Sequence, residues 1–434
     1  MTPAADVVAF NAAASAAETP AALAEPVTPV GKRFIALFTL ANLGLFTGMF
    51  GAASLLLPRQ IELVSPNGKE AVLALASGLG ALAALLANPL VGALSDRTTS
   101  RFGRRHIWTL GGVVIGALAL TLLGGQASLA GVLVLWCVAM AALNGMLAAL
   151  TAEVPDHVPV QQRAVTSAFM GLMPATGSVI GVVVIVFVFT ELSTGYAALA
   201  AIAVLLTLPF VLTTRDAALP RAVLTPFRWR DFLAGFWISP RLHPDFAWAW
   251  ITRFLMQLGS AMFTLYLLFF LRDRIHYEQV FPGGRSEEGV FILTLIYTLC
   301  ALLTATTVGL LSDRSGRRKI FVIVSSMIQG AGMLMLAFWQ TWIAVECATA
   351  IVALGYGAYI AVDQAMITQV LPAAGNRGKD LGVINFAIAG PYALAPVFAA
   401  PLVTKLGGYP VLFAVAGTIL VLGGIFVRNI KSVP

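Results

Sequence analysis

Two charged residues stand inside apolar stretches of the sequence, where a charge is costly. Arg253 lies in WAWITRFLMQLGSAMFT and Asp363 lies in GYGAYIAVDQAMI. Ionisable groups at membrane depth are rare, pair with other polar groups, and mark ion or substrate pathways. A carboxylate in such a place is a candidate for ion coupling, and an arginine is its natural counter-charge. These two residues are therefore the first candidates for chemistry.

A polar loop with acidic and basic residues occurs twice. GALSDRTTSRFGRR ends at Arg105, and the shorter GLLSDRSGRR ends at Arg318. Each copy lies between two apolar runs, and the aspartates Asp96 and Asp313 are 217 positions apart. Such a repeat indicates that the two loops do the same work in two related units.

Other landmarks repeat in the same order. Pro174 in GLMPATG and Pro391 in IAGPYALAP have the same 217-residue offset. DHVPVQQR, which ends at Arg163, corresponds to QVLPAAGNR, which ends at Arg377. The order of these landmarks indicates an internal duplication. The two prolines predict break points in the helices that contain them.

The composition places these motifs in a membrane protein. Of 434 residues, 59% are hydrophobic and 11% are charged, and the mean hydropathy is +0.88. A soluble protein carries about 25% charged residues, and a membrane helix needs about 20 apolar residues. Apolar runs of this length predict an all-α integral membrane protein with twelve spans. The expected spans are 34–57, 70–94, 106–125, 129–152, 164–189, 196–213, 246–270, 288–311, 320–338, 341–366, 381–403 and 409–427.

The basic residues predict the orientation. Twenty Lys and Arg fall on the side of the termini and six on the other side, and Arg253 lies within a span. The positive-inside rule then places both termini in the cytoplasm of a multi-pass protein of the cell membrane. Basic residues beside the membrane spans explain the net charge of +7. No nucleic-acid partner is therefore expected.

The chain divides into four parts. Residues 1–31 are expected to be a disordered cytoplasmic tail, 32–213 a first six-helix bundle, 214–245 a cytoplasmic linker, and 246–434 a second six-helix bundle. Within the linker, PFRWRDFLAGFWIS has the pattern of a short helix in the membrane interface. The competing interpretation is a loop that contacts its own bundle.

The two loops resemble the signature of the major facilitator superfamily. Gly92-x-x-x-Asp96-Arg97 and Gly309-x-x-x-Asp313-Arg314 carry the resemblance, which extends over about residues 32 to 430. The resemblance implies two pseudo-symmetric six-helix bundles that rock about a midplane site. The longer first copy, SDRTTSRFGRR, is similar to the sucrose and glycoside:cation symporter branch.

The resemblance also implies a latch between the bundles on the cytoplasmic side. A helix start carries unpaired N–H groups and a partial positive charge. Asp96 is expected to bind the start of span eleven near Lys379, and Asp313 is expected to bind the start of span five near Arg163. These contacts would close the cytoplasmic side and would break when that side opens.

The glycines and arginines of the loops are expected to assist this latch. Gly92 and Gly309 would let helices approach closely. Arg97 and Arg314 are expected to bind acidic groups nearby, and the remaining arginines to face lipid headgroups: Arg104, Arg105, Arg317 and Arg318. The simpler interpretation is that the whole cluster only fixes topology.

The family fold places spans one, four, seven and ten around a central cavity. Arg253 and Asp363 would then pair across that cavity near the cytoplasmic gate and serve in coupling. In the competing interpretation, Arg253 reaches the interface and Asp363 binds Arg314 or Arg317.

Polar and aromatic residues on these spans are candidates for substrate binding. Trp250, Gln257, Ser260 and Thr264 share one face of span seven with Arg253. Further candidates are Asn42, Asn144, Tyr266, Tyr356, Tyr359, Asn385 and Tyr392. Any of them could instead be a helix–helix contact.

The leading hypothesis is secondary active symport of a small polar solute, a sugar or glycoside, with a proton or another cation. The runner-up is proton-coupled efflux of amphipathic compounds. An enzyme is not expected, because four scattered histidines lack metal-ligand spacing and no nucleophile–base cluster stands out. No cofactor or metal is expected, and the chain is expected to act as a monomer in the lipid bilayer.

Overall fold

The chain folds into a helical membrane protein. The computed structural model describes residues 26–216, 218–219, 240–315, 317–370 and 377–431. Within this part of the chain, 12 helices are long and apolar enough to cross a membrane. Their positions agree with the twelve predicted spans within a few residues. The predicted interfacial helix at 226–239 and most of the predicted tail lie outside the described residues.

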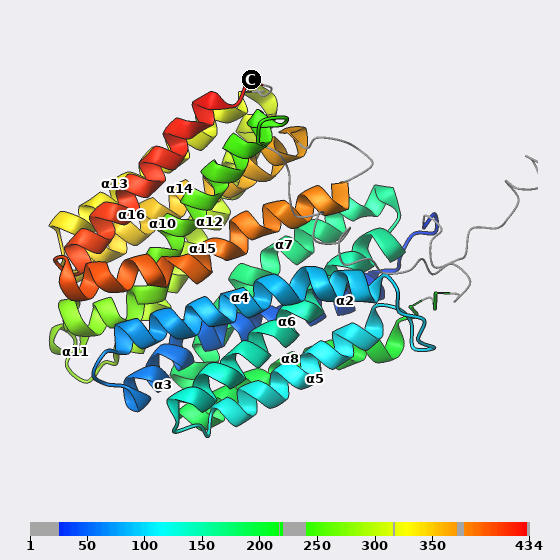
Figure 1. The fold of residues 1–434 in the computed structure, drawn as a ribbon, viewed down its shortest axis with the longest axis horizontal. Coiled ribbons are helices and arrows are strands. Elements are labelled where there is room, and N and C mark those ends of the chain that lie inside the picture. Colours follow the sequence, from blue (N-terminus) through cyan, green and yellow to red (C-terminus); the bar gives the residue numbers. More distant parts are fainter. Residues whose placement is uncertain (1–25, 217, 220–239, 316, 371–376, 432–434) are drawn as a thin grey trace, which may run out of the picture.

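The helices form two bundles that lie against each other (Figure 1). The first half contains α2 (Lys32–Gly51), η1 (Ala52–Leu56), α3 (Leu57–Val64), α4 (Lys69–Ser95), α5 (His106–Leu123), α6 (Leu129–His157), α7 (Val160–Val183), η2 (Val184–Val188) and α8 (Leu192–Thr213). The second half contains α10 (Pro244–Phe270), η4 (Leu271–Ile275), α11 (Tyr277–Val280), α12 (Ser286–Ser315), α13 (Arg318–Phe338), α14 (Trp342–Val370), α15 (Arg377–Lys405), α16 (Tyr409–Phe426) and η6 (Val427–Asn429).

The two halves touch most closely at one end of the molecule. At the end with α3 and α11, on the left of Figure 1, the bundles converge, and toward the opposite end they diverge. We call the first the sealed end, and the end that holds residues 96–105 the motif end. Along the boundary, α4 packs against α15 and α7 packs against α12. The arrangement is that of two bodies joined near one end.

Apolar side chains point outward from these bundles as well as inward. Leu118 of α5, Leu205 of α8 and Leu303 of α12 are each more than half exposed. In a soluble protein such a surface would aggregate, but in hydrocarbon it is the favoured state, since the backbone hydrogen bonds are satisfied within each helix.

The helices are not interrupted at the prolines predicted to break them. α7 continues through Pro174 and α15 continues through Pro391. Wider π-helical turns occur instead in η1, η2 and η4, which continue α2, α7 and α10. These turns lie toward the sealed end, so the helix irregularities gather where the two halves meet.

Two glycines allow α7 to cross α2 at close range. A side-chain carbon at Gly177 would lie 2.8 Å from the backbone nitrogen of Thr47, and one at Gly181 would lie 2.8 Å from Cα of Gly51. The four-residue spacing of Gly177 and Gly181 is the small-residue pattern that lets membrane helices pack backbone to backbone. This crossing fixes the positions of the two helices that carry η1 and η2.

We therefore expect Gly181→Val to destabilise the protein by roughly 1–3 kcal/mol, since an inserted side chain must push α2 away. The measurement is the thermal unfolding midpoint of the purified protein in detergent. Gly171→Val is the matched control on the same helix, because nothing lies within 4 Å of a side-chain carbon there. Equal midpoints for the two variants would contradict the close crossing.

Candidate transport site and gates

A buried ion pair joins α10 to α14. Arg253 Nε lies 3.0 Å from Asp363 Oδ2, and the two side chains are 6% and 0% exposed. Burial of a charge in an apolar bundle is tolerated only when it is paired. The structure thus brings together the two charged residues singled out from the sequence and does not place Arg253 at the interface.

Polar side chains continue from this pair along α10. The carbonyl oxygen of Gln257 and the hydroxyl of Ser260 are buried without a hydrogen-bond partner among the described residues. The hydroxyl of Thr264 donates to the Ser260 backbone carbonyl at 3.1 Å. Buried polar atoms normally have a hydrogen-bond partner. The unpaired side-chain oxygens of Gln257 and Ser260 are therefore what a binding site for a polar solute would contain.

Tyrosines from three helices of the second half gather beside this stripe. The ring of Tyr297 on α12 lies 5.7 Å from that of Tyr356, which lies 6.4 Å from Tyr359 on the same helix, α14. Tyr392 of α15 lies close enough to interact electrostatically with Tyr356. Tyr356 and Tyr359 also lie within electrostatic range of the Arg253–Asp363 pair. Tyr297 was missed in the sequence, because span eight was not among the spans assigned to the cavity.

An aromatic stack lies near the start of α10. Trp250 stacks on Phe254 with ring centroids 5.2 Å apart, and Phe386 of α15 lies 6.2 Å from Trp250. Flat aromatic surfaces of this kind suit the faces of sugar rings as well as the apolar parts of amphipathic molecules.

The first half contributes fewer polar groups. Asn42 of α2 is fully buried and donates to the Phe38 carbonyl at 2.9 Å, and its own side-chain oxygen has no partner among the described residues. Asn144 of α6 donates to the Met140 carbonyl at 2.9 Å and contacts the sulfur of Met49 at 3.6 Å. The side-chain NH2 groups of both asparagines thus already have hydrogen-bond acceptors within the protein.

Two other predicted binding residues are placed differently. Tyr266 lies toward the sealed end, and its hydroxyl donates to the backbone carbonyl of Glu70 in the other half at 3.3 Å. It therefore takes part in the contact between the halves. The side chain of Asn385 lies outside the described part of the structure.

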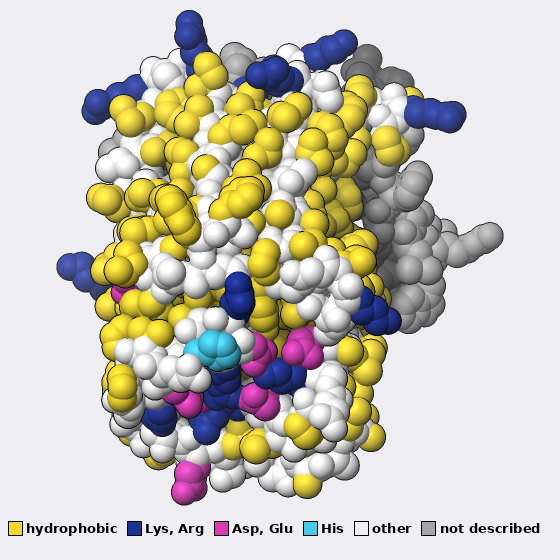
Figure 2. All heavy atoms as spheres, turned by 90° about the vertical axis from the view of Figure 1, so that its left-hand side faces the viewer, with side chains coloured by type: hydrophobic (Ala, Val, Ile, Leu, Met, Phe, Trp, Pro, Cys, Tyr) yellow, Lys and Arg dark blue, Asp and Glu magenta, His cyan; other side chains and the backbone are white. Residues whose placement is uncertain are grey.

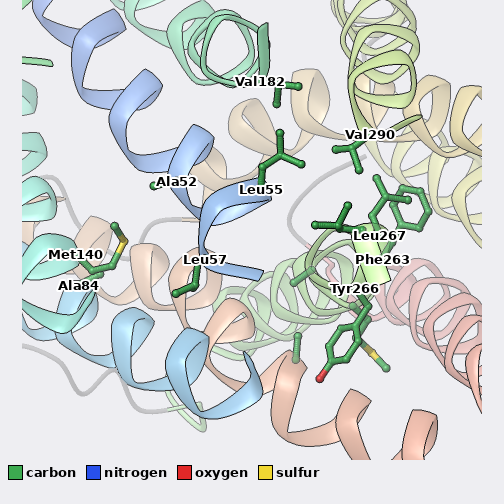
Figure 3. Close-up of a cluster of buried hydrophobic side chains, with 14 of the residues drawn as sticks. Ala52, Leu55, Leu57, Ala84, Met140, Val182, Phe263, Tyr266, Leu267 and Val290 are labelled. Atoms are coloured by element: carbon green, nitrogen blue, oxygen red, sulfur yellow. The ribbon is translucent and has the colours of Figure 1, made fainter. Parts of the chain in front are cut away.

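An apolar layer closes the boundary between the halves. Figure 3 shows Leu55 and Val182 of the first half facing Val290, Phe263 and Leu267 of the second, and all five are buried. A further edge-to-face contact joins Phe187 to Phe291, with centroids 5.1 Å apart. These contacts pack the two halves against each other at this end.

A layer of charges covers this apolar layer at the sealed end. Figure 2 shows acidic and basic side chains gathered there. Glu287 pairs with Arg59 of the first half at 3.2 Å and with Arg272 at 2.7 Å, and Arg272 also pairs with Glu62 of the first half. Four charges thus connect the two halves in one network.

The network extends at both sides. Lys69 of the first half pairs with Asp273 of the second at 2.7 Å, and Asp273 accepts a hydrogen bond from the Tyr409 hydroxyl at 3.0 Å. Arg285 donates to the Val186 backbone carbonyl in the other half. A single exposed pair contributes little to stability, but a network of several pairs holds the two halves together at this end.

At the motif end, the arginines predicted to face headgroups are buried. Arg104 pairs with Asp156 at 2.6 Å, and Arg105 pairs with Asp156 at 2.8 Å and with Asp96 at 2.5 Å. Burial lowers the pKa of the Arg105 guanidinium, the carboxylates of Asp156 and Asp96 raise it, and the net shift is upward. The prediction that Arg104 and Arg105 face lipid headgroups was wrong, because both side chains are buried in ion pairs with carboxylates of the first half.

The two latch glycines lie in open surroundings. A side-chain carbon at Gly92 would meet nothing within 4 Å, and one at Gly309 would meet only Ala361 at 3.6 Å, so neither glycine makes the predicted close approach in this state. Arg314 and Arg317 are exposed, and Arg97 and Arg318 are half-buried. The side chains of Asp313 and of the start of α15 lie outside the described residues.

Comparisons with known proteins agree with this architecture. The sequence profile of the Major Facilitator Superfamily matches residues 34–305 and 284–432. An uncharacterized MFS-type transporter of Bacillus subtilis (strain 168), YfiU, is 30% identical over 141 residues, which are 32% of this chain and 27% of that protein. The matched stretch thus spans about a quarter of that relative's length.

Solved structures show the same fold at low identity. The nucleoside transporter NupG, in a mutant form, has a TM-score of 0.71 at 15% identity over 91% of this chain and 100% of its own. A POT family transporter in complex with a thioalcohol-conjugated peptide has a TM-score of 0.71 at 14% identity over 91% and 95%. A bacterial homolog of the human lysosomal transporter Spinster, inward-facing and unoccupied, has a TM-score of 0.62 at 14% identity over 92% and 96%.

The charged layer makes a specific prediction. Glu287→Gln removes the ion pair with Arg59, which connects the halves, and the pair with Arg272 of its own half, which then keeps Glu62 as its partner. A partly exposed ion pair contributes about 1 kcal/mol or less. We expect the population with a separated sealed end to rise roughly fivefold. The measurement is the distance between spin labels at Leu63→Cys and Val280→Cys, one in each half, with Cys137, Cys300 and Cys347 replaced.

The neighbouring carboxylate provides the control. Glu288 pairs with Arg285 of its own half at 3.4 Å, so Glu288→Gln should leave the distance distribution close to that of the parent. If both variants match the parent, the charges do not hold the sealed end.

Proposed function

The chain belongs to the Major Facilitator Superfamily and is a membrane transporter, and from this premise we propose that it moves a sugar or glycoside together with a proton. The observation that carries the proposal is the buried Arg253–Asp363 pair at one end of a polar, aromatic face of the second half. Such a pair offers one titratable carboxylate and one fixed positive charge beside the expected solute site.

The pair couples the two ligands through charge balance. While Asp363 is ionised, Arg253 is neutralised and both charges are tolerated. When Asp363 takes a proton, the arginine keeps its charge in a low-dielectric site, where an unpaired charge is costly. A solute that offers hydroxyl oxygens to Arg253 then stabilises the protonated state, so proton and solute favour each other's binding.

The side chains near the pair suit a polyhydroxylated solute. Gln257 and Ser260 offer unsatisfied polar atoms, and Trp250, Tyr297 and Tyr356 offer ring faces. A sugar uses both kinds of group, whereas an amphipathic compound would leave the buried polar atoms unsatisfied.

The state of the gates supports transport by alternating access. We propose that the motif end faces the cytoplasm of the cell membrane, so that the structure is closed outward and open inward. In this state Asp96 is held by Arg105, which fits a latch that is disengaged. Rocking the halves would separate the charged layer at the sealed end and bring Asp96 to the start of α15.

Uptake into proteoliposomes under an imposed pH gradient tests the function. We expect accumulation of one or more sugars or glycosides from a panel, and its collapse when the gradient is removed. The panel includes cationic dyes. Extrusion of dyes without uptake of any sugar would replace the proposal with proton-coupled efflux.

Asp363→Asn tests the coupling site. Asn has the same shape but cannot take up the proton, so we expect pH-driven accumulation to fall at least about tenfold. Exchange of labelled for unlabelled solute without a gradient should stay within about twofold, because it needs no net proton movement. Unchanged accumulation would exclude Asp363 as the coupling carboxylate.

Two further variants keep this test interpretable. Asp363→Asn alone leaves Arg253 buried and unpaired, which can cost about 3–5 kcal/mol, so Arg253→Gln/Asp363→Asn is compared with it. Glu346→Gln, on the same helix but at its other end, is the matched control and should retain accumulation.

A further inference from the structure

A polar cavity lies at the sealed end, among the charged side chains that Figure 2 shows there. Its volume is about 350 Å³, which is within the range of pockets that hold small molecules. Both halves form its walls, since Glu62 belongs to α3 and the other lining residues belong to the second half. The lining consists of Glu62, Arg272, His276, Tyr277, Glu278, Gln279 and Ser286. The proposed transport cycle assigns no role to this cavity.

The apolar layer separates this cavity from the polar stripe of α10. Arg272 follows Ser260 by twelve residues along α10 and η4, which is about 18 Å along the helix axis. Phe263 and Leu267, which belong to the apolar layer, lie between them in the sequence. The cavity is therefore a different site from the one beside Arg253.

Three side chains of the lining can bind a ligand without giving up an ion pair. His276 and Gln279 are exposed, and neither side chain has a hydrogen bond or ion pair within the described part of the chain. The exposed carboxylate of Glu278 accepts a hydrogen bond from the Ser286 hydroxyl at 3.5 Å and forms no ion pair with another described residue. Together they offer a carboxylate acceptor, an amide that both donates and accepts, and an imidazole.

The backbone of His276 adopts a conformation that side chains rarely allow. Its φ is +52° and its ψ is +51°, and no other non-glycine residue in the described ranges has a positive φ. Residues held in such conformations cluster at active sites and ligand-binding places. The backbone N–H of Gln279 donates to the His276 carbonyl at 2.8 Å, so this turn also fixes the start of α11.

Aromatic packing holds the wall of the cavity in place. Tyr277 is 4% exposed, and its ring lies 4.9 Å from the ring of Phe281 and 4.9 Å from that of Trp342. The side chains on either side of Tyr277 in α11 are thus carried by a segment that is anchored in the second half. A preformed wall lowers the entropy that a ligand must lose on binding.

The lining favours a neutral ligand that is rich in hydroxyl groups. Arg272 lies on the same wall as the carboxylates of Glu62 and Glu278, so a cation and an anion would each meet a like charge. A hydroxyl group can accept from the guanidinium or the amide and can donate to a carboxylate. An uncharged polyol therefore uses both kinds of group in this cavity.

We propose that this cavity is an outer docking site for the sugar or glycoside, occupied while the two halves are still joined. Glu62 is the one lining residue from the first half. Separation of the halves removes this wall, which weakens binding in the cavity and releases the solute toward the opening route. The inference rests on the orientation and the solute class of the proposed function.

Hydrogen–deuterium exchange in lipid nanodiscs tests the site without transport. Each sugar and each cationic dye of the uptake panel is added at saturating concentration. We expect at least one sugar to slow exchange in the peptide that covers residues 277–281 at least about threefold, because a bound ligand restrains α11 and suppresses its local opening. Gln257→Ala/Ser260→Ala, which removes the unpaired polar atoms of α10, should keep this protection.

A pair of variants locates the binding. Glu278→Gln/Gln279→Ala removes two of the ligand groups, so the protection should be lost. Both residues are exposed, so the thermal unfolding midpoint should stay that of the parent. Glu288→Gln is the matched control, because it makes the same charge change outside the lining and should keep the protection.

The outcomes separate this inference from the proposed function. The inference is overturned if no sugar protects α11, if only dyes protect it, or if Glu278→Gln/Gln279→Ala keeps the protection, even when sugars are taken up. Loss of protection in Gln257→Ala/Ser260→Ala also overturns it, because the sugar then acts from the stripe of α10. Protection by a sugar without uptake of any sugar supports the cavity and contradicts the proposed function instead.

Discussion

A charge inside an apolar bundle must have a partner, and this constraint governs three separate places in the protein. At the sealed end, Glu287 and Arg272 find partners across the boundary between the halves. Within the second half, Arg253 and Asp363 find each other. At the motif end, Arg104 and Arg105 find their partners in Asp96 and Asp156 of the same half. A buried carboxylate or arginine can leave its partner at a small cost in free energy only when another partner is near. A movement of the helices or a bound ligand can supply that other partner, so these sites can link conformational change to ligand binding.

The duplicated fold carries an unequal distribution of chemistry. The second half provides the buried ion pair, the tyrosines and the unsatisfied polar atoms of α10. The first half provides the charge cluster at the motif end and the close crossing of α2 and α7. Under the proposed function, the second half holds the solute and the first half carries the latch aspartate.

The sequence predicted well how far along a helix each residue lies, but predicted poorly which side of the helix faces the interior. Spans, loops and the depth of Arg253 and Asp363 follow from hydropathy, which requires a fixed length of apolar chain to cross the membrane. Tyr266 was assigned to the solute site and lies at the boundary between the halves, whereas Tyr297 was not assigned at all. Helices that are apolar on every side give little indication of which face is turned inward.

The charged loop at residues 96–105 shows a second limit of prediction from the sequence. Arg104 and Arg105 look like topology signals, because basic residues beside a span usually are. Their carboxylate partners come from Asp96, nearby in the chain, and from Asp156, about fifty residues later. Asp216, His106 and His157 lie beside them only because the start of α5 and the ends of α6 and α8 are at the same level. Contacts between distant loops require the three-dimensional arrangement, which a single sequence does not contain.

The π-helical turns in η1, η2 and η4 have a consequence for how this protein compares with its relatives. Such a turn accommodates one residue more than an α-helical turn. All residues beyond it are rotated by about 100° relative to an uninterrupted helix of 3.6 residues per turn. In a relative without these turns, the equivalent helices are each one residue shorter. Correct alignment then needs single-residue gaps inside membrane helices, where alignments normally allow none.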